Sequence, residues 1–323
     1  GSEMCIRDRS KVKGLTAFCH VLTESNTTHK SVPMLMSSVS AHDFNSIYQQ
    51  KSIITTFKEA GYQTAFFSNQ RYNHSFIDFF GKEADTCNFI KENVKHANYN
   101  PSDDELLELV ATELAKNAPK QFIVLHTYGS HFNYRERYPS ENAFFLPDFP
   151  VDAEVKYKDN LVNAYDNSIR YTDDFLARLI GMLQEQNTDA AMLYTSDHGE
   201  DIFDDSRRLF LHASPVPSYY QIHVPFLLWM SDSYRDHYPS LWENTISNKQ
   251  KNISSSASFF HTMLELGGVT TPYRNDSLSV VNVLFTEKPR VYLNDHNEAR
   301  SLNEIGMGEE DFEMLQQKGI LYR

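Results

Sequence analysis

The chain has 323 residues, 41% of them hydrophobic and 13% aromatic, which is enough apolar material for one large α/β domain or two ordinary ones. The formal net charge of −13 at pH 7 would repel nucleic acid phosphates, so nucleic acid is not an expected partner. No apolar run approaches the roughly 18 to 20 residues that a membrane-spanning helix requires.

Short apolar segments typical of strands alternate with amphipathic segments of helical period. This alternation predicts an α/β fold with a mostly parallel central sheet and helices on both faces. In chain order, we expect a strand at 15–22, a helix at 53–60, a strand at 64–68, a helix at 103–116 capped by Ser102, a strand at 122–127, a helix at 153–185, and strands at 190–195 and 223–230. The tail after residue 286 carries only weak signals, for a short hairpin or a final helix at 309–318.

Polar clusters follow the predicted strands, where ligands gather in parallel sheets. The sequence YTSDHGED at 194–201 places Asp197 and His198 side by side after a buried strand. Adjacent carboxylate and imidazole groups on a turn can reach one cation, and such mixed ligands suit zinc or manganese better than calcium. The alternative is that Asp197 caps a following helix and that His198 has no role.

A second cluster, LHTYGSHFNYRERYP at 125–139, presents histidines and arginines on a loop after a strand. Arginine matches tetrahedral anions with paired hydrogen bonds, so this loop is a candidate phosphate or sulfate site. We favour a functional role for His131 and a structural role for His126 within the strand. The alternative for Arg135 and Arg137 is that they are ordinary surface residues.

Two further segments carry weaker signals. NTTHKSVPMLM at 26–36 offers hydroxyl groups, and a hydroxyl bound to a dication becomes a competent nucleophile near neutral pH. Ordinary capping of a helix by Thr27, Thr28 or Ser31 is the alternative. LFLHASP at 209–215 contributes a single histidine, His212.

Three cysteines, Cys5, Cys19 and Cys87, allow at most one disulfide, and their spacing fits no Cys-x-x-Cys metal site. A bridge between Cys19 and Cys87 stays open at this point.

Together and in this order, these segments resemble the catalytic domain shared by phosphoethanolamine transferases, lipoteichoic acid synthases and sulfatases of the alkaline phosphatase superfamily. The chain carries TxxSVP at 28–33, GSHxxYxxRYP at 129–139 and SDHGE at 196–200, with His212 shortly after. The resemblance covers about residues 15–267, and its first two motifs point to the phosphoethanolamine transferase branch.

The resemblance implies that Thr28 is the nucleophile and also touches zinc, with Asp197 and His198 as further zinc ligands. It implies that His131 and His212 hold the transferred phosphate or a second metal. The other substrate-binding residues that it implies are Asn26, Asn69 and Gln70.

One family feature has no counterpart in the chain. The family pattern has a glutamate metal ligand after its first strand, well upstream of the nucleophile, and residues 11–28 leave no room for it. We expect residues 1–10 to be a tag or non-native leader that includes Glu3, and 11–323 to be the soluble catalytic domain, with the first strand and an N-terminal membrane anchor missing. Such a truncation would weaken zinc binding and activity. The native protein would then lie in the bacterial inner membrane with this domain in the periplasm.

The function expected from the resemblance is metal-dependent transfer of phosphoethanolamine from phosphatidylethanolamine to a lipid A or glycan acceptor, through a covalent intermediate on Thr28. One alternative is a sulfatase or phosphodiesterase on the same fold, with water as the final acceptor. The chain lacks the Cys/Ser-x-Pro-x-Arg signature that type I sulfatases carry. The other alternative is a non-catalytic binding domain that has lost its metal.

Overall fold

The computed structural model describes residues 12–93 and 100–322, and the chain forms two compact units. The first unit comprises Lys58–Glu185 and Ile202–Leu211, and the second comprises the described part of Ser2–Phe57 with Gln186–Asp201 and His212–Arg323. Among the helices of these described residues, none combines the length and the apolar character needed to span a bilayer.

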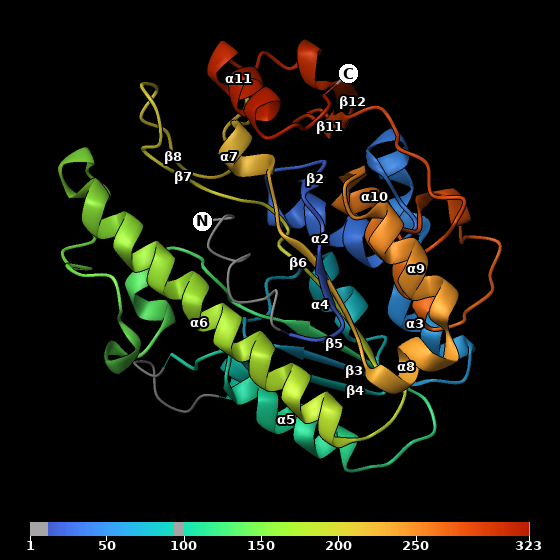
Figure 1. The fold of residues 1–323 in the computed structure, drawn as a ribbon. Helices are drawn as coiled ribbons and strands as arrows, with labels where there is room; N and C mark the ends of the chain where they lie inside the picture. Colours follow the sequence, from blue (N-terminus) through green and yellow to red (C-terminus); the bar gives the residue numbers. More distant parts are fainter. Residues whose placement is uncertain (1–11, 94–99, 323) are drawn as a thin grey trace. The chain divides into compact units, whose positions relative to one another are not determined.

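The first unit is built on a three-stranded parallel sheet with strand order β4-β3-β5, whose strands lie side by side in Figure 1. Because the strands are parallel, their carboxyl ends lie at one edge, where Ser68 pairs with both Phe89 and His126. The elements of this unit are β3 (Gln63–Ser68), α4 (Phe76–Gly81), β4 (Thr86–Phe89), the 3₁₀ helix η3 (Ile90–Asn93), α5 (Glu105–Leu114), β5 (Gln121–His126), the 3₁₀ helices η4 (Tyr134–Arg137), η5 (Ser140–Asn142) and η6 (Val155–Tyr157), α6 (Lys158–Glu185) and β8 (Phe210–Leu211), which pairs with β7 (Asp201–Ile202).

The long helix α6 packs against η4 through one apolar stripe, in which Leu161 and Ala164 are fully buried beside Tyr134. It begins five residues later than the sequence predicted, because η6 occupies the turn before it. The predicted cap of α5 is wrong: the helix begins at Glu105 with Asp104 at the capping position, and no side chain caps it.

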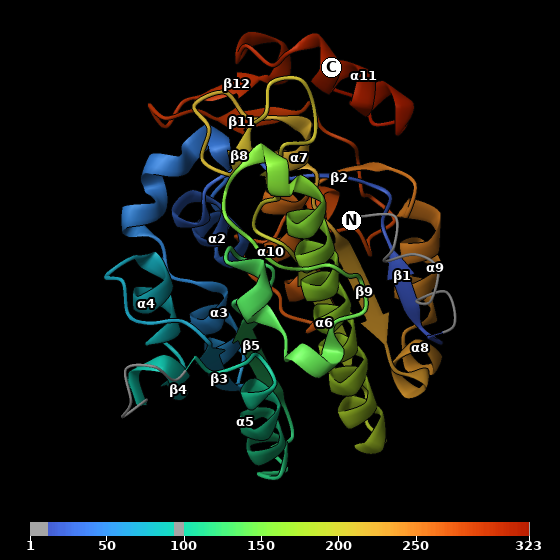
Figure 2. The ribbon, with the colours of Figure 1, turned by 90° about the vertical axis from the view of Figure 1, so that its left-hand side faces the viewer.

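The second unit contains an antiparallel sheet with strand order β1-β9-β6, and Figure 2 shows β1 alongside β9. A parallel pair, β2 with β10, and an antiparallel hairpin, β11 with β12, complete its strands. The elements of this unit are β1 (Leu15–Ala17), β2 (His20–Leu22), α2 (Thr28–Met36), the 3₁₀ helix η2 (Ala41–Gln49), α3 (Ile53–Glu59, which ends in the first unit), β6 (Ala191–Thr195), α7 (Tyr219–Ile222), β9 (Phe226–Met230), α8 (Asp232–His237), α9 (Pro239–Asn248), β10 (Asn252–Ser254), α10 (Ser255–Leu266), the 3₁₀ helix η7 (Asp276–Leu278), β11 (Val291–Leu293), β12 (Ala299–Ser301), the 3₁₀ helix η8 (Leu302–Glu304) and α11 (Glu309–Gln317).

The predicted α/β fold class is confirmed, but the sheets are mixed rather than mostly parallel. The single strand predicted at 15–22 is divided into β1 and β2, which pair in different sheets. The break occurs because the amide of Phe18 donates to Phe226 while the next amide, of Cys19, donates to Lys249. The thiols of Cys19 and Cys87 are free, so the two residues form no disulfide.

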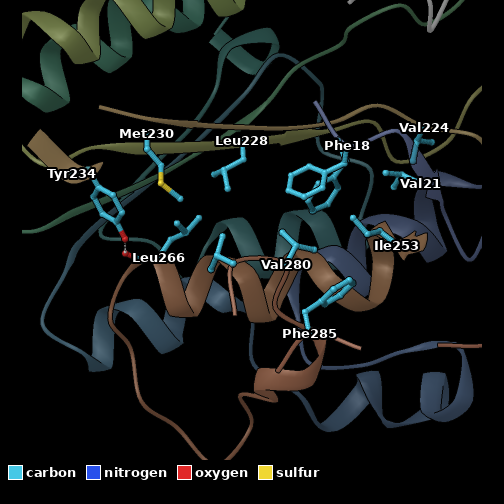
Figure 3. Packing of buried hydrophobic residues seen from close by; sticks show 12 residues of the cluster. Phe18, Val21, Val224, Leu228, Met230, Tyr234, Ile253, Leu266, Val280 and Phe285 are labelled. Carbon is cyan, nitrogen blue, oxygen red and sulfur yellow. Dashed lines mark hydrogen bonds between the residues drawn. The ribbon is translucent and has the colours of Figure 1, made fainter. Parts of the chain in front are cut away.

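The core of the second unit lies between β9 and α10. Figure 3 shows Phe18, Leu228 and Met230 pointing toward Leu266 and Val280, and all five side chains are buried. Sequence reasoning missed α10 because its first turn is rich in serine. The side chain of Ser254 caps that turn by accepting a hydrogen bond from the amide of Ala257.

His261 on α10 is buried in neutral form, because its Nδ1 accepts a hydrogen bond from the amide of Asn275. Burial lowers the pKa of His261 from 6.5 to about 4. Protons therefore bind the unfolded chain more tightly than the folded one, and stability is lost as pH falls from 6.5 toward 4.

Replacing His261 with glutamine, which does not titrate but keeps a hydrogen-bond acceptor, should make the fall in stability between pH 6.5 and 4 shallower. The expected difference in unfolding free energy across this range is on the order of a few kcal/mol. Urea unfolding at several pH values measures it. Parallel stability profiles for the two proteins would show that His261 is not responsible.

Candidate active site

Thr28 is the first residue of α2, and its hydroxyl is directed at His198 rather than at the helix backbone. Thr28 Oγ1 lies 3.1 Å from His198 Nε2. The capping position belongs to Thr27, whose side chain makes no capping hydrogen bond, and the Ser31 hydroxyl donates to the carbonyl of Ser25. Capping alone therefore does not account for the hydroxyl-rich segment.

His198 and Asp197 lie on the loop after β6, and the chain continues into β7 rather than into a helix that Asp197 would cap. Asp197 Oδ2 lies 3.4 Å from His198 Nε2. His198 is 8% exposed, and its Nδ1 lies 3.0 Å from the carbonyl oxygen of Gly199. A carbonyl can only accept, so Nδ1 donates to Gly199 and Nε2 is the ring nitrogen that faces Thr28 and Asp197.

These three side chains supply a hydroxyl, a carboxylate and an imidazole around one point. Two ligands of a tetrahedral zinc, each about 2.0–2.1 Å from the metal, stand roughly 3.3 Å apart, and separations of 3.1 and 3.4 Å match that spacing. No group of three His, Cys, Asp or Glu side chains within residues 12–93 and 100–322 is placed to hold a metal ion. The donors therefore fit zinc only as a set that includes the threonine hydroxyl.

His212 lies beside His198, with ring centroids 4.1 Å apart. Its Nδ1 is 3.0 Å from Glu200 Oε1, and the Glu200 side chain is only 6% exposed. Glu200 thus orients His212, a role that sequence reasoning did not assign. The available signal was the position of Glu200 within SDHGE, two residues after His198.

Asn26, which the sequence predicted to bind substrate, is 2% exposed, and its polar atoms are bound within the protein. The amide nitrogen donates to Gln221 Oε1 at 2.6 Å and to the Ser214 carbonyl at 2.9 Å. The amide oxygen accepts from the Tyr292 hydroxyl at 2.6 Å. Asn26 therefore positions the loop that carries Thr28.

Gln221 extends this network to the SDHGED segment. Its side-chain nitrogen donates to Asp201 Oδ2 at 2.5 Å, and Asp201 also accepts from the Ser218 hydroxyl. Asp201 and Gln221 are fully buried. One chain of hydrogen bonds thus connects the Thr28 loop with the segment that carries Asp197 and His198.

The remaining predicted substrate residues belong to the first unit. Asn69, which the sequence predicted to face a head group, is 1% exposed; its side-chain nitrogen donates to Asp103 and to the Pro101 carbonyl, and its buried Oδ1 has no hydrogen-bond partner among the described residues. Gln70 is half-buried and lies 3.3 Å from His126 Nε2. Its side chain therefore contacts the carboxyl end of β5.

His131 is exposed, and its Nδ1 lies 2.6 Å from the carbonyl of Phe132. His126 fits the structural role expected of it, since its Nδ1 contacts the Ser68 hydroxyl at 2.9 Å. Arg135 is bound to Asp148, and Arg137 donates to the Asn133 carbonyl, so neither is an ordinary surface residue.

Gly199 is required by a close approach of backbone. A Cβ at this position would lie 2.1 Å from the carbonyl oxygen of Tyr220, while the Gly199 amide donates to the Gln221 carbonyl at 2.8 Å. Any side chain at 199 would push the SDHGE loop away from α7.

The α/β fold thus carries this grouping of hydroxyl, carboxylate and imidazole on its second unit. A family model described as Sulfatase matches residues 7–269, and the chain belongs to that family.

Among curated relatives, the phosphoethanolamine transferase EptC of Escherichia coli K12 is 25% identical over 287 residues, which cover 85% of this chain and 48% of the relative. The chain therefore spans about half the length of that relative. Over a shorter stretch, 42% of this chain and 24% of the relative, the Kdo(2)-lipid A phosphoethanolamine 7''-transferase of Escherichia coli K12 is 38% identical.

A crystal structure of the C-terminal periplasmic domain of Escherichia coli EptC in complex with zinc has the same fold. Its TM-score is 0.83 at 23% identity, and the match covers 94% of this chain and 86% of that one.

Replacing Gly199 with alanine should displace Asp197 and His198 and weaken zinc binding at least about tenfold, because the new methyl group collides with the Tyr220 carbonyl. Gly181, inside α6 with nothing within 4 Å of its would-be Cβ, is the matched control. Alanine there should leave zinc affinity unchanged and stabilise the helix by up to about 1 kcal/mol. Calorimetric zinc titration measures both effects, and equal affinities in the two variants would contradict the role of Gly199.

Proposed function

We propose that the chain is the catalytic domain of a phosphoethanolamine transferase that moves phosphoethanolamine from a phospholipid to a phosphate or hydroxyl group of a bacterial glycolipid or glycan. The observation that carries the proposal is the 3.1 Å approach of Thr28 Oγ1 to His198 Nε2, with Asp197 beside it. The names of the relatives agree with this activity.

We assign zinc binding to Thr28, Asp197 and His198, with manganese as the other metal suited to such donors. Bound there, the metal would lower the pKa of the threonine hydroxyl and stabilise negative charge on the phosphoryl oxygens. The known zinc complex of the EptC domain is the precedent.

In the first half-reaction, Thr28 Oγ1 forms a bond to phosphorus as the bond from phosphorus to the diacylglycerol oxygen breaks. The hydroxyl proton of Thr28 passes to that departing oxygen, and phosphoethanolamine remains on Thr28. In the second half-reaction, an oxygen of the acceptor bonds to phosphorus, and Thr28 leaves with its proton restored. We assign proton transfer to His212, because Glu200 accepts from its Nδ1 and keeps the ring beside His198.

The native location that follows from this proposal is the periplasmic face of the bacterial inner membrane, where both lipid substrates are at hand. It agrees with the description of the EptC domain as periplasmic. His131 is proposed to contact the transferred phosphate, since its imidazole is exposed on the GSH loop.

A hydrolase with water as final acceptor is the second candidate, and the match to the Sulfatase family model favours it. The two functions share the first half-reaction and differ only in the second. With a lipid A acceptor present, a modified glycolipid supports the transferase, and release of free phosphoethanolamine alone supports the hydrolase.

Replacing Thr28 with alanine should abolish the covalent intermediate and lower transfer roughly 10³-fold or more, because the substitution removes the attacking oxygen. The matched control is Thr27→Ala, which removes a neighbouring hydroxyl 3.2 Å from Ser25 Oγ. It should retain the intermediate.

The measurement is intact-mass spectrometry of zinc-loaded protein after incubation with phosphatidylethanolamine micelles. A phosphoethanolamine adduct on Thr28→Ala at the wild-type level would remove Thr28 from its proposed role. Thr28→Ser, which keeps the hydroxyl, should form the adduct more slowly.

A further inference from the structure

Two basic side chains of the first unit share one aromatic ring. The Lys91 ammonium nitrogen lies 3.6 Å from the centre of the Tyr128 ring, and the Arg137 guanidinium carbon lies 4.2 Å from the same centre. Lys91 follows β4 and Tyr128 follows β5, so the group forms where these parallel strands have their carboxyl ends. Ligands gather at such edges.

Both side chains are largely covered by the protein. Lys91 is 8% exposed, and the Arg137 side chain is 7% exposed. Burial, aided by repulsion from Arg137, lowers the pKa of Lys91 to about 8. Within the described part of the chain, the Lys91 ammonium donates no hydrogen bond to a protein oxygen. An ammonium group that is partly desolvated and has no hydrogen-bonded partner is stabilised when an anion joins it.

The nearby carboxylates offset this positive charge only in part. Asp103 accepts hydrogen bonds from the amides of Tyr128 and Gly129, at 2.8 and 2.9 Å, so it is committed to the loop. Glu136 lies 2.9 Å from Arg137 but is 58% exposed, and an exposed carboxylate contributes little. Within residues 12–93 and 100–322, neither carboxylate forms an ion pair with Lys91.

We propose that Lys91 and Arg137, held on the ring of Tyr128, form a binding site for a phosphate monoester. A monoester carries about −1.5 to −2 charges near neutral pH, which matches two cations, whereas a diester carries only about one. Arginine offers paired donors to the phosphate oxygens, and lysine adds a point charge.

The Tyr128 ring explains how the two cations can lie so close before a ligand arrives. The negative face of an aromatic ring stabilises a cation by about 0.5–2 kcal/mol. The His131 ring lies 5.1 Å from the same ring, so the site joins the GSH loop. This assignment rests on the proposed function: the bound monoester is the phosphate group of the acceptor. An acceptor that offers only a sugar hydroxyl would not bind at this site.

The test is calorimetric titration of the metal-free protein with glucose 1-phosphate, a monoester, and with glycerophosphoethanolamine, a diester that represents the donor head group. Lys91→Met keeps an unbranched side chain over Tyr128 without charge, and Lys91→Arg keeps the charge. The matched control is Lys82→Met, since Lys82 is exposed and lies 4.7 Å from the Tyr72 ring.

Wild type, Lys91→Arg and Lys82→Met should bind glucose 1-phosphate with affinities within about threefold of one another, and Lys91→Met should bind it about tenfold or more weakly. The diester should bind more weakly than the monoester to the wild type. Wild-type affinity in a folded Lys91→Met protein, or no binding by the wild type, would overturn the site. Tighter binding of the diester would overturn the assignment to a monoester.

If Lys91→Met does not fold, NMR of the Lys91 side-chain amine in the wild-type protein tests the site instead. It should shift on addition of glucose 1-phosphate, and an unchanged signal would overturn the site. These measurements need neither metal nor Thr28, so a protein that binds the monoester but transfers nothing would sink the proposed function and leave the site standing.

Discussion

The approach of Thr28 Oγ1 to His198 Nε2 joins two residues 170 positions apart, and the chemistry depends on it. Neither side chain can take part in phosphoryl transfer alone, because a threonine hydroxyl is a weak nucleophile until a metal or base activates it. The second unit therefore has to hold two loops, one carrying Thr28 and the other His198, at a fixed separation.

The short helix α7 connects those loops. The carbonyl of Ile222 accepts the amide of Thr23 at 2.9 Å on the nucleophile side, and the carbonyl of Gln221 accepts the amide of Gly199 at 2.8 Å on the SDHGE side. The Gln221 side chain lies between Asn26 and Asp201 and adds polar contacts to both. Four hydrogen bonds made by the adjacent residues Gln221 and Ile222 thus fix the distance between the Thr28 hydroxyl and the His198 imidazole.

Glu24 secures the nucleophile loop from its other side. Its carboxylate accepts the amide of Ala41 at 2.9 Å and the hydroxyl of Ser254 at 2.8 Å, and its carbonyl accepts the amide of Leu293 at 2.7 Å. Burial raises the pKa of Glu24, and the hydrogen bonds from Ala41 and Ser254 to its carboxylate oppose this rise. The loop that presents Thr28 is therefore held by the chain on both of its flanks.

Sequence was informative where periodicity or motif order reports a local property. The long helix and the strands β3, β5 and β6 follow from apolar spacing, and the pairing of Thr28 with His198 follows from the order of the family motifs. The sequence did not show which polar side chains already have hydrogen-bond partners within the fold. Asn26 and Asn69 look like ligand-binding amides, and only the fold shows that neighbouring groups occupy their donors. Lys91 belongs to no sequence motif. Its burial arises from packing on Tyr128, which the sequence does not show.

Anomalous diffraction at the zinc edge, from crystals of the zinc-loaded protein, would test whether Thr28 belongs to the metal site. We predict a zinc peak about 2.0–2.2 Å from Thr28 Oγ1, an Asp197 carboxylate oxygen and His198 Nε2. A zinc ion bound elsewhere, with the Thr28 hydroxyl outside its coordination sphere, would contradict it.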